Sequence, residues 1–150
     1  MYHTIVKTIV RKSFEHVSNR NYELMLKDCA PNVKHRFGGN HALGGERNDI
    51  VTLRQWFKRL GTVLPNLKLT VRNVWVKGWP HHTTIFVRWD ASATLANGEP
   101  YQNRGVHIIT MKWGKVHSLD EHVDSQAVAE ALKKQAQAGI SEAAAAKLES

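Results

Sequence analysis

The sequence predicts an α+β fold in which three helices precede a curved antiparallel sheet and one helix follows it. Apolar residues recur at helical spacing through the first 64 residues. From residue 67 to residue 123, β-branched and aromatic side chains alternate with polar ones. Short turn-like sequences join these β segments, so we expect them to pair as an antiparallel meander. Helices packed on one face of such a sheet would leave a conical cavity between the two layers.

Helices are expected first along the chain. From Thr4 to about Ser18, apolar residues recur three and four positions apart, which predicts an amphipathic helix. A short second helix is expected to start at Tyr22 and to end before Pro31. Its register turns Cys29 toward the core, which favours a packing role for this thiol.

A short strand is expected next, over residues 33–37, before a glycine-punctuated loop over residues 38–45. Asn48 or Asp49 then suits the N-cap of a third helix, whose apolar stripe runs from Ile50 to Leu64. Four long strands follow, over residues 67–79, 83–95, 101–113 and 115–123. Asp124 is expected to cap a final helix that continues to about Gln137.

The length and composition indicate one domain with its own core, since the chain has 150 residues, 42% of them hydrophobic. We expect this domain over residues 1–138 and a helical or frayed arm over residues 139–150. The single Cys29 excludes an internal disulfide and favours a reducing, cytoplasmic setting. No apolar run approaches the roughly 18 residues of a membrane helix, and the first residues lack the apolar stretch of a signal peptide.

The net charge of +8 raises the question of nucleic-acid binding. Residues 1–119 carry 18 Lys+Arg against 7 Asp+Glu, or +11, whereas residues 120–150 carry 3 against 6, or −3. The positive charges are scattered, and no aromatic RNA-binding signature accompanies them. A solvated basic surface is therefore expected, and nucleic acid is not an expected partner.

Several stretches resemble one known family. They are residues 98–107 (GEPYQNRGVH), 113–116 (WGKV) and 120–124 (DEHVD), with 37–47 (FGGNHALGGER) and 56–60 (WFKRL) earlier in the chain. Together they resemble SnoaL-like proteins of the nuclear transport factor 2-like superfamily over about residues 4–137. The resemblance implies a cone-shaped curved antiparallel sheet wrapped by three N-terminal helices, a cystatin-like α+β barrel, with a C-terminal helix. It is weak for the chemistry, because the superfamily holds isomerases, dehydratases, hydrolases, polyketide cyclases and members without catalysis.

Side chains alternate along a strand, so each strand turns one set toward the expected cavity. In the third long strand, the set that contains Asn103 and His107 is the less charged one, which favours an inward position. In the last strand, Glu121 shares a side with the apolar Leu119 and is expected to face inward. Asp120 belongs to the opposite set and is the competing candidate for the pocket.

The resemblance also implies roles for some of these positions. His35 falls where ketosteroid isomerases carry a general-base carboxylate, and His107 falls near their oxyanion-stabilising acid. Glu121 occupies the place of a carboxylate in the final strand motif of limonene epoxide hydrolases. Scytalone dehydratase is similar in building its site largely from histidines. The apolar walls of the pocket are expected from Phe14, Trp56 and Trp89.

These residues predict a small cofactor-independent enzyme, a cyclase, isomerase or dehydratase, that acts on an apolar carbonyl-bearing molecule. An imidazole can exchange a proton near neutrality, and a nearby carboxylate fixes its tautomer. We hypothesise that His35 or His107 removes a proton α to the carbonyl, while Asn103 and the other imidazole stabilise the enolate oxygen. The alternative is a non-catalytic ligand-binding or protein-interaction module, in which the two histidines are structural and Glu121 is an exposed strand residue.

The expected partners are a small apolar molecule in the cavity and a second copy of the chain. We expect a homodimer through the outer face of the sheet, where Val106 and Ile108 add apolar area. No metal site is expected, because the nine histidines show no metal-ligand spacing.

Overall fold

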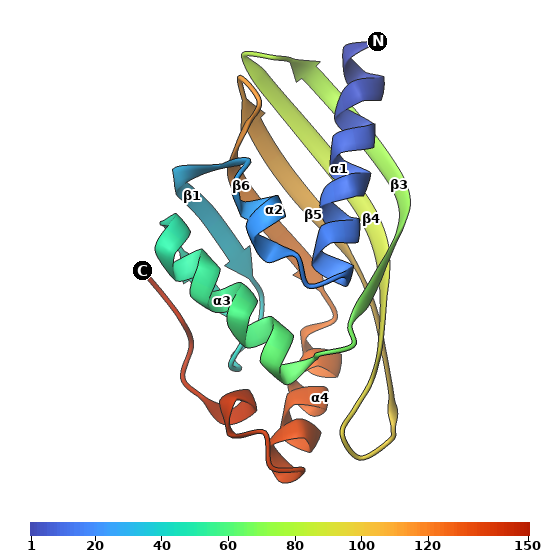
Figure 1. Ribbon diagram of the computed structural model, residues 1–150, viewed down its shortest axis with the longest axis vertical. Helices are drawn as coiled ribbons and strands as arrows, with labels where there is room; N and C mark the ends of the chain where they lie inside the picture. Colours follow the sequence, from blue (N-terminus) through green and yellow to red (C-terminus); the bar gives the residue numbers. More distant parts are fainter.

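Six strands form one curved sheet that is open at both edges, in the order β2-β1-β6-β5-β4-β3. The computed structural model describes residues 1–150 and is drawn in Figure 1. The strands are β1 (Cys29–Phe37), β2 (Gly45–Arg47), β3 (Lys68–Trp79), β4 (His82–Thr94), β5 (Pro100–Lys112) and β6 (Lys115–Val123). The helices are α1 (Tyr2–Ser18), α2 (Tyr22–Leu26), α3 (Ile50–Val63) and α4 (Ser125–Gln137).

The expected meander is present, since β3, β4, β5 and β6 pair antiparallel with their sequence neighbours. The chain also adds β1 to the meander, parallel to β6. This parallel pairing brings the first strand beside the last one, so residues about 85 positions apart in sequence lie together at the centre of the sheet.

Two local expectations for the early part of the chain were wrong. Cys29 begins β1 instead of continuing α2, although it is buried as expected. Pro31 lies inside this strand, between Cys29 and Lys34, where the β1–β6 register is interrupted. Such an irregularity tolerates proline because no ladder hydrogen bond from its nitrogen is needed there. The end of the glycine-rich loop forms the short strand β2, which has too few residues to show an alternating pattern.

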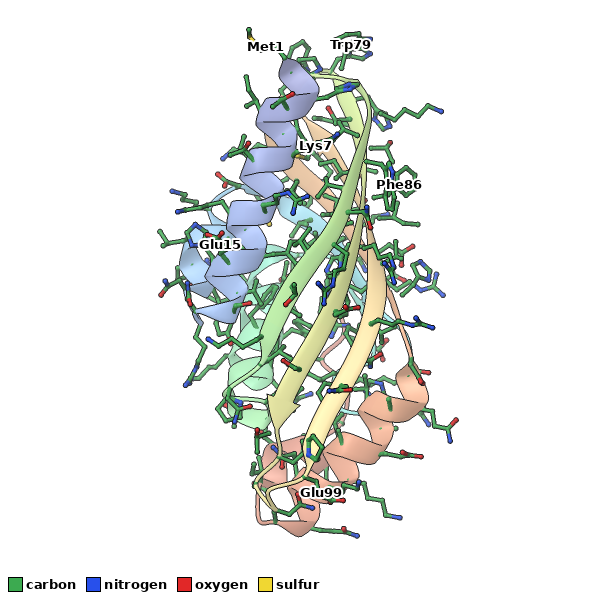
Figure 2. The ribbon with its side chains drawn as sticks, turned by 90° about the vertical axis from the view of Figure 1, so that its right-hand side faces the viewer. Met1, Lys7, Glu15, Trp79, Phe86 and Glu99 are labelled. Atoms are coloured by element: carbon green, nitrogen blue, oxygen red, sulfur yellow. The ribbon has the colours of Figure 1, made fainter.

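The helices cover the concave face of the sheet. Helix α1 runs alongside β3 and buries Val6, Val10 and Phe14. Figure 2 shows this helix from the side, with Phe86 of β4 on the opposite face of the sheet. Asp49 caps α3 as expected, because its carboxylate accepts a 2.7 Å hydrogen bond from the amide of Thr52. None of the helices is long and apolar enough to cross a bilayer.

The C-terminal segment packs on the domain rather than extending from it. After α4, a 3₁₀ helix (Ser141–Ala144) leads into an extended stretch. Two buried arginines bind backbone carbonyls of this stretch. Arg59 donates to Ala146 at 2.7 Å, and Arg47 donates to Leu148 at 2.9 Å.

Candidate active site

A cavity of about 330 Å³ lies between the helices and the concave face of the sheet. Of the 29 residues that line it, 22 are hydrophobic. Its walls include the three expected aromatic residues, Phe14, Trp56 and Trp89. The transfer of an apolar ligand from water into this cavity is therefore favourable.

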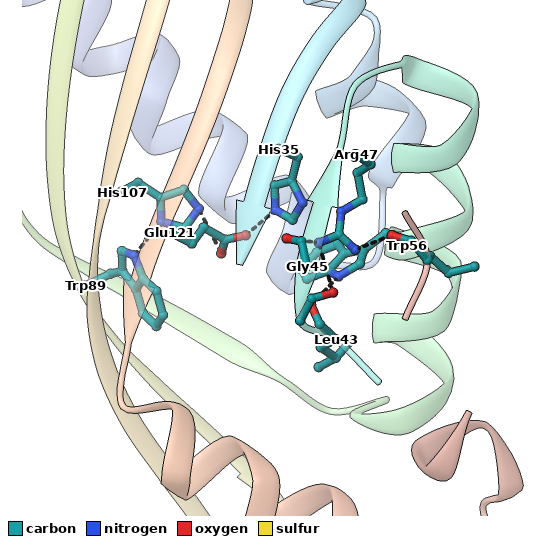
Figure 3. A network of polar contacts seen from close by, with 10 residues as sticks. His35, Leu43, Gly45, Arg47, Trp56, Trp89, His107 and Glu121 are labelled. Carbon is teal, nitrogen blue, oxygen red and sulfur yellow. Dashed lines mark hydrogen bonds and ion pairs between the residues drawn. The ribbon is translucent and has the colours of Figure 1, made fainter. Parts of the chain in front are cut away.

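The carboxylate of Glu121 lies in this mostly apolar wall, held between two imidazoles (Figure 3). Glu121 contacts Nε2 of His35 through one oxygen and Nε2 of His107, at 3.0 Å, through the other. The sheet topology explains the cluster. Strand β6 runs between β1 and β5, and Glu121 pairs directly with His107 on the β5 side. On the β1 side it pairs with Phe37, and His35 lies two residues before Phe37 on the same face.

Trp89 fixes the hydrogen-bonding state of His107. The indole Nε1–H donates a 2.6 Å hydrogen bond to Nδ1 of the imidazole. An indole nitrogen can only donate, so Nδ1 carries no proton and the proton of neutral His107 is on Nε2, facing Glu121. The ring of Phe14 packs edge-on against the same imidazole, with centroids 5.0 Å apart.

The surroundings of His35 are different. Its side chain is 1% exposed, and its ring lies 4.4 Å from that of Trp56. Its Nδ1 is buried and has no hydrogen-bond partner. Nε2 is therefore the one nitrogen through which His35 makes a polar contact, and this contact goes to Glu121.

The structure adds a buried cation, Arg47, that the sequence analysis missed. Arg47 is the cross-strand partner of His35, is fully buried, and lies 5.5 Å from the centre of the Trp56 ring. Carbonyl oxygens bind its guanidinium, including that of Gly45 at 2.7 Å. Burial lowers the pKa of Arg47 to about 10, so it stays charged at neutral pH and offsets the nearby Glu121 charge. Its position just after the glycine-rich loop, in a strand of three residues, gave no signal of burial.

The cluster has a definite charge state near neutrality. Burial alone would raise the pKa of Glu121, but the attraction and hydrogen bonds of His107 and His35 outweigh it and hold this pKa below the ordinary value of 4.5. Burial lowers the pKa of His35 below 6.5, against the opposing effect of Glu121. Glu121 is therefore ionised and His35 is neutral.

The remaining two candidates do not line the cavity. Asn103 lies near the start of β5, beside the N-cap of α4, where its amide donates to the hydroxyl of Tyr101 at 2.9 Å. Asp120 lies on the outer face of the sheet, where it contacts His122 at 3.1 Å. The sequence analysis missed Tyr101, which does line the cavity.

Two other features bear on the chemistry. No three His, Cys, Asp or Glu side chains are arranged to hold a metal ion. Burial, together with the charge of Asp28, raises the pKa of Cys29 to about 11, so this thiol is not ionised at neutral pH.

The fold is that of a SnoaL-like domain. Residues 10–119 match the SnoaL-like domain family, and the chain belongs to that family. No curated protein matches the chain.

Solved structures share the fold at low sequence identity. PrhC from Penicillium brasilianum NBRC 6234 is 15% identical with a TM-score of 0.79, and the match covers 95% of each chain. TerC, co-crystallised with polyporic acid, is 22% identical with a TM-score of 0.71, and the match covers 83% of this chain and 95% of TerC. A protein from Jannaschia sp. CCS1 described as a SnoaL-like polyketide cyclase is 19% identical with a TM-score of 0.65, over 84% of this chain and 89% of the other.

Proposed function

We propose that the protein is a cofactor-independent enzyme of the isomerase, cyclase or dehydratase type that moves a proton on a small apolar carbonyl compound. One observation carries the proposal. An ionised carboxylate, Glu121, is held by two imidazoles in the wall of a mostly apolar cavity. Proton-handling groups of this kind, collected in a water-poor pocket, are typical of acid–base active sites.

Glu121 is the proton acceptor in this proposal, in place of either imidazole. The lone pair on Nδ1 of His107 is occupied by Trp89, and Nε2–H of the same ring already donates to Glu121. The free Nδ1 of His35 is buried, and this side chain is 1% exposed. Glu121 keeps 9% of its side-chain surface exposed and lines the cavity. The imidazoles are then positioning residues that orient the carboxylate.

The step balances without a cofactor. The C–H bond α to the substrate carbonyl breaks, the proton forms an O–H bond on Glu121, and the electron pair moves to the carbonyl oxygen as an enolate. Return of the proton to a different carbon gives an isomer. Alternatively, the enolate electron pair re-forms the carbonyl and expels a β-hydroxyl group, which takes the proton from Glu121 and leaves as water, to give a dehydration product. The apolar walls exclude water and strengthen the electrostatic interactions in the site.

The comparisons support a small organic ligand. The chain is SnoaL-like, one structural neighbour was co-crystallised with polyporic acid, and another is described as a polyketide cyclase. A cavity of about 330 Å³ suits a molecule of a few fused rings.

Deuterium exchange tests the chemistry without knowledge of the natural substrate. Apolar ketones such as 2-tetralone are incubated in D₂O, and loss of the α-proton signal is followed by NMR. We expect wild-type protein to accelerate exchange and Glu121→Gln to abolish the acceleration. Glu130→Gln, which removes an α4 carboxylate that does not line the cavity, is the matched control. Equal acceleration by Glu121→Gln would overturn the assignment.

A non-catalytic binding module is the second candidate, and the low pKa of Glu121 favours it because a weakly basic carboxylate is a poor proton acceptor. Native mass spectrometry of the purified protein separates the candidates. A module should retain a small molecule unaltered over many hours, whereas an enzyme should convert added ketone.

We also propose a homodimer through the outer face of the sheet. Trp75, Phe86 and Ile108 are cross-strand neighbours in register on β3, β4 and β5, and Trp75 is 52% exposed. This apolar row supports the proposal, because a row of this kind on a sheet face is a suitable surface for a second copy. Light scattering should give twice the monomer mass at micromolar concentration. A monomer mass for wild-type protein would contradict the dimer.

A further inference from the structure

The hydroxyl of Tyr101 is a polar group in the cavity wall that the proton-transfer step does not use. Tyr101 lies on β5, is 8% exposed and lines the cavity. Its oxygen accepts a 2.9 Å hydrogen bond from Nδ2 of Asn103. A tyrosine hydroxyl also has a proton to donate, and no protein acceptor receives it. A buried donor without an acceptor is costly unless a ligand or water supplies one.

The fold holds this hydroxyl in place through Asn103. Besides donating to Tyr101, the Asn103 amide donates to the carbonyl oxygen of Asp124 at 3.1 Å and accepts from the Asp124 amide at 3.3 Å. The carboxylate of Asp124 in turn caps α4 by accepting from the amides of Gln126 and Ala127, each at 3.1 Å. The direction of the Tyr101 oxygen is thus set by the junction between β6 and α4.

Burial raises the pKa of Tyr101, against the lowering effect of the Asn103 hydrogen bond, so the side chain is a neutral hydroxyl near pH 7. Both amide hydrogens of Asn103 are used, one on Tyr101 and one on Asp124. The amide nitrogen of Asn103 is a donor only and cannot accept the hydroxyl proton, so this proton is free for a ligand.

We propose that Tyr101 donates a hydrogen bond to an acceptor oxygen of the bound ligand and that Asn103 is the positioning residue for this contact. The ligand class is an apolar ring compound whose carbonyl, ether or phenol oxygen lies against Tyr101. This subsite rests on the proposed use of the cavity for ligands. It adds a specificity-determining contact on the same strand as His107, six residues earlier.

Two matched probes test the subsite, 2-acetylnaphthalene and its hydrocarbon analogue 2-ethylnaphthalene. Wild-type protein should bind both, and Tyr101→Phe should weaken binding of the ketone by about 3- to 10-fold, with little change for the hydrocarbon. The infrared carbonyl stretch of bound ¹³C-labelled ketone should shift to higher frequency in the variant. Asn103→Ala should have the same kind of effect, smaller in size. Tyr22→Phe removes a hydroxyl that does not line the cavity and is the control.

The outcomes also separate this subsite from the proton-transfer proposal. An equal loss for both probes, or no loss for either, overturns the role of Tyr101. If neither probe binds wild-type protein, the ligand cavity itself is rejected, and the subsite with it. Glu121→Gln should keep the Tyr101-dependent preference for the ketone even where exchange of its α-protons is lost. If Glu121→Gln loses α-proton exchange but still prefers the ketone over the hydrocarbon, the subsite is supported. If Glu121→Gln still exchanges the α-protons, only the role of Glu121 is rejected.

Discussion

Trp89 and His107 form a hydrogen bond that decides what the imidazole can do. The indole N–H donates to Nδ1 at 2.6 Å, so the opposite nitrogen, Nε2, carries the proton and donates it to Glu121 at 3.0 Å. A second proton on this ring would face the indole N–H and break the bond. His107 is therefore a fixed donor to the carboxylate, in a chain that continues from Glu121 to His35.

Replacing Trp89 with Phe should remove the hydrogen bond at Nδ1 of His107. In wild-type protein, ¹⁵N NMR should show Nδ1 of His107 as an unprotonated nitrogen and Nε2 as an N–H. In Trp89→Phe, Nε2 should keep its proton because Glu121 still accepts it, whereas the Nδ1 signal should move toward that of a nitrogen that accepts no hydrogen bond, and the protein should lose about 1–3 kcal/mol of stability. A protonated Nδ1 in wild-type protein at pH 7.5 would contradict the chain of hydrogen bonds.

Gly105 leaves the space in which the Trp89 ring lies. A Cβ at this position would come within 2.6 and 2.9 Å of ring atoms of Trp89 and within 2.6 Å of a backbone oxygen, that of His122. We therefore expect Gly105→Ala to displace the indole and to cost about 1–3 kcal/mol in the free energy of unfolding. Denaturant titration measures the cost. Gly38→Ala is the control, because nothing lies within 4 Å of the added methyl.

The burial of His35 should make stability depend on pH. The pKa of His35 is lowered in the folded state, so the unfolded chain takes up a proton near pH 6.5 while the folded protein resists it. The free energy of unfolding should therefore fall as the pH drops below 6.5, until the lowered pKa is reached. Glu121 adds a further loss below about pH 4.5, because its folded pKa is also lowered.

The variant His35→Gln should remove the first of these two losses, since glutamine can still donate to Glu121 but does not titrate. Thermal or urea unfolding between pH 5 and pH 7.5 gives the comparison. His81→Gln, at an exposed turn position, should keep the wild-type pH dependence. A His35→Gln variant with an unchanged slope would show that His35 is not the buried titrating group.

The sequence predicted most of the sheet and the inward direction of its key residues, because alternation is a strong signal over long strands. Glu121 and His107 lie on the cavity side for this reason. The same rule could not find Arg47, since a three-residue strand has no readable period and arginine is usually exposed. The alternation rule also could not tell which of Asn103 and Tyr101 lines the cavity, because residues 101 and 103 lie on the same face of β5. In the structure Tyr101 lines the cavity, whereas the amide of Asn103 binds the Tyr101 hydroxyl and the backbone of Asp124, the N-cap of α4.

The C-terminal stretch should contribute to stability through the two buried arginines. Deleting residues 146–150 removes the carbonyls that Arg59 and Arg47 bind at 2.7 and 2.9 Å. The loss of an acceptor should lower the free energy of unfolding by about 1–3 kcal/mol for each arginine. The loss should be smaller where a water molecule takes the place of the carbonyl. Calorimetry should show a lower Tm for the deletion. Lys147→Ala, which keeps every backbone carbonyl, should have a Tm close to that of wild type.

The most direct test of a proton-transferring carboxylate in this cavity is the rate of α-deuterium incorporation into 2-tetralone at pD 7.5, with and without protein. Wild-type protein should exceed the Glu121→Gln variant by about 100-fold or more, the usual size of a lost general base. The variant should still bind the ketone, because the apolar walls are unchanged. Exchange in the variant at the wild-type rate, or no acceleration by wild-type protein that binds the ketone, would contradict the account.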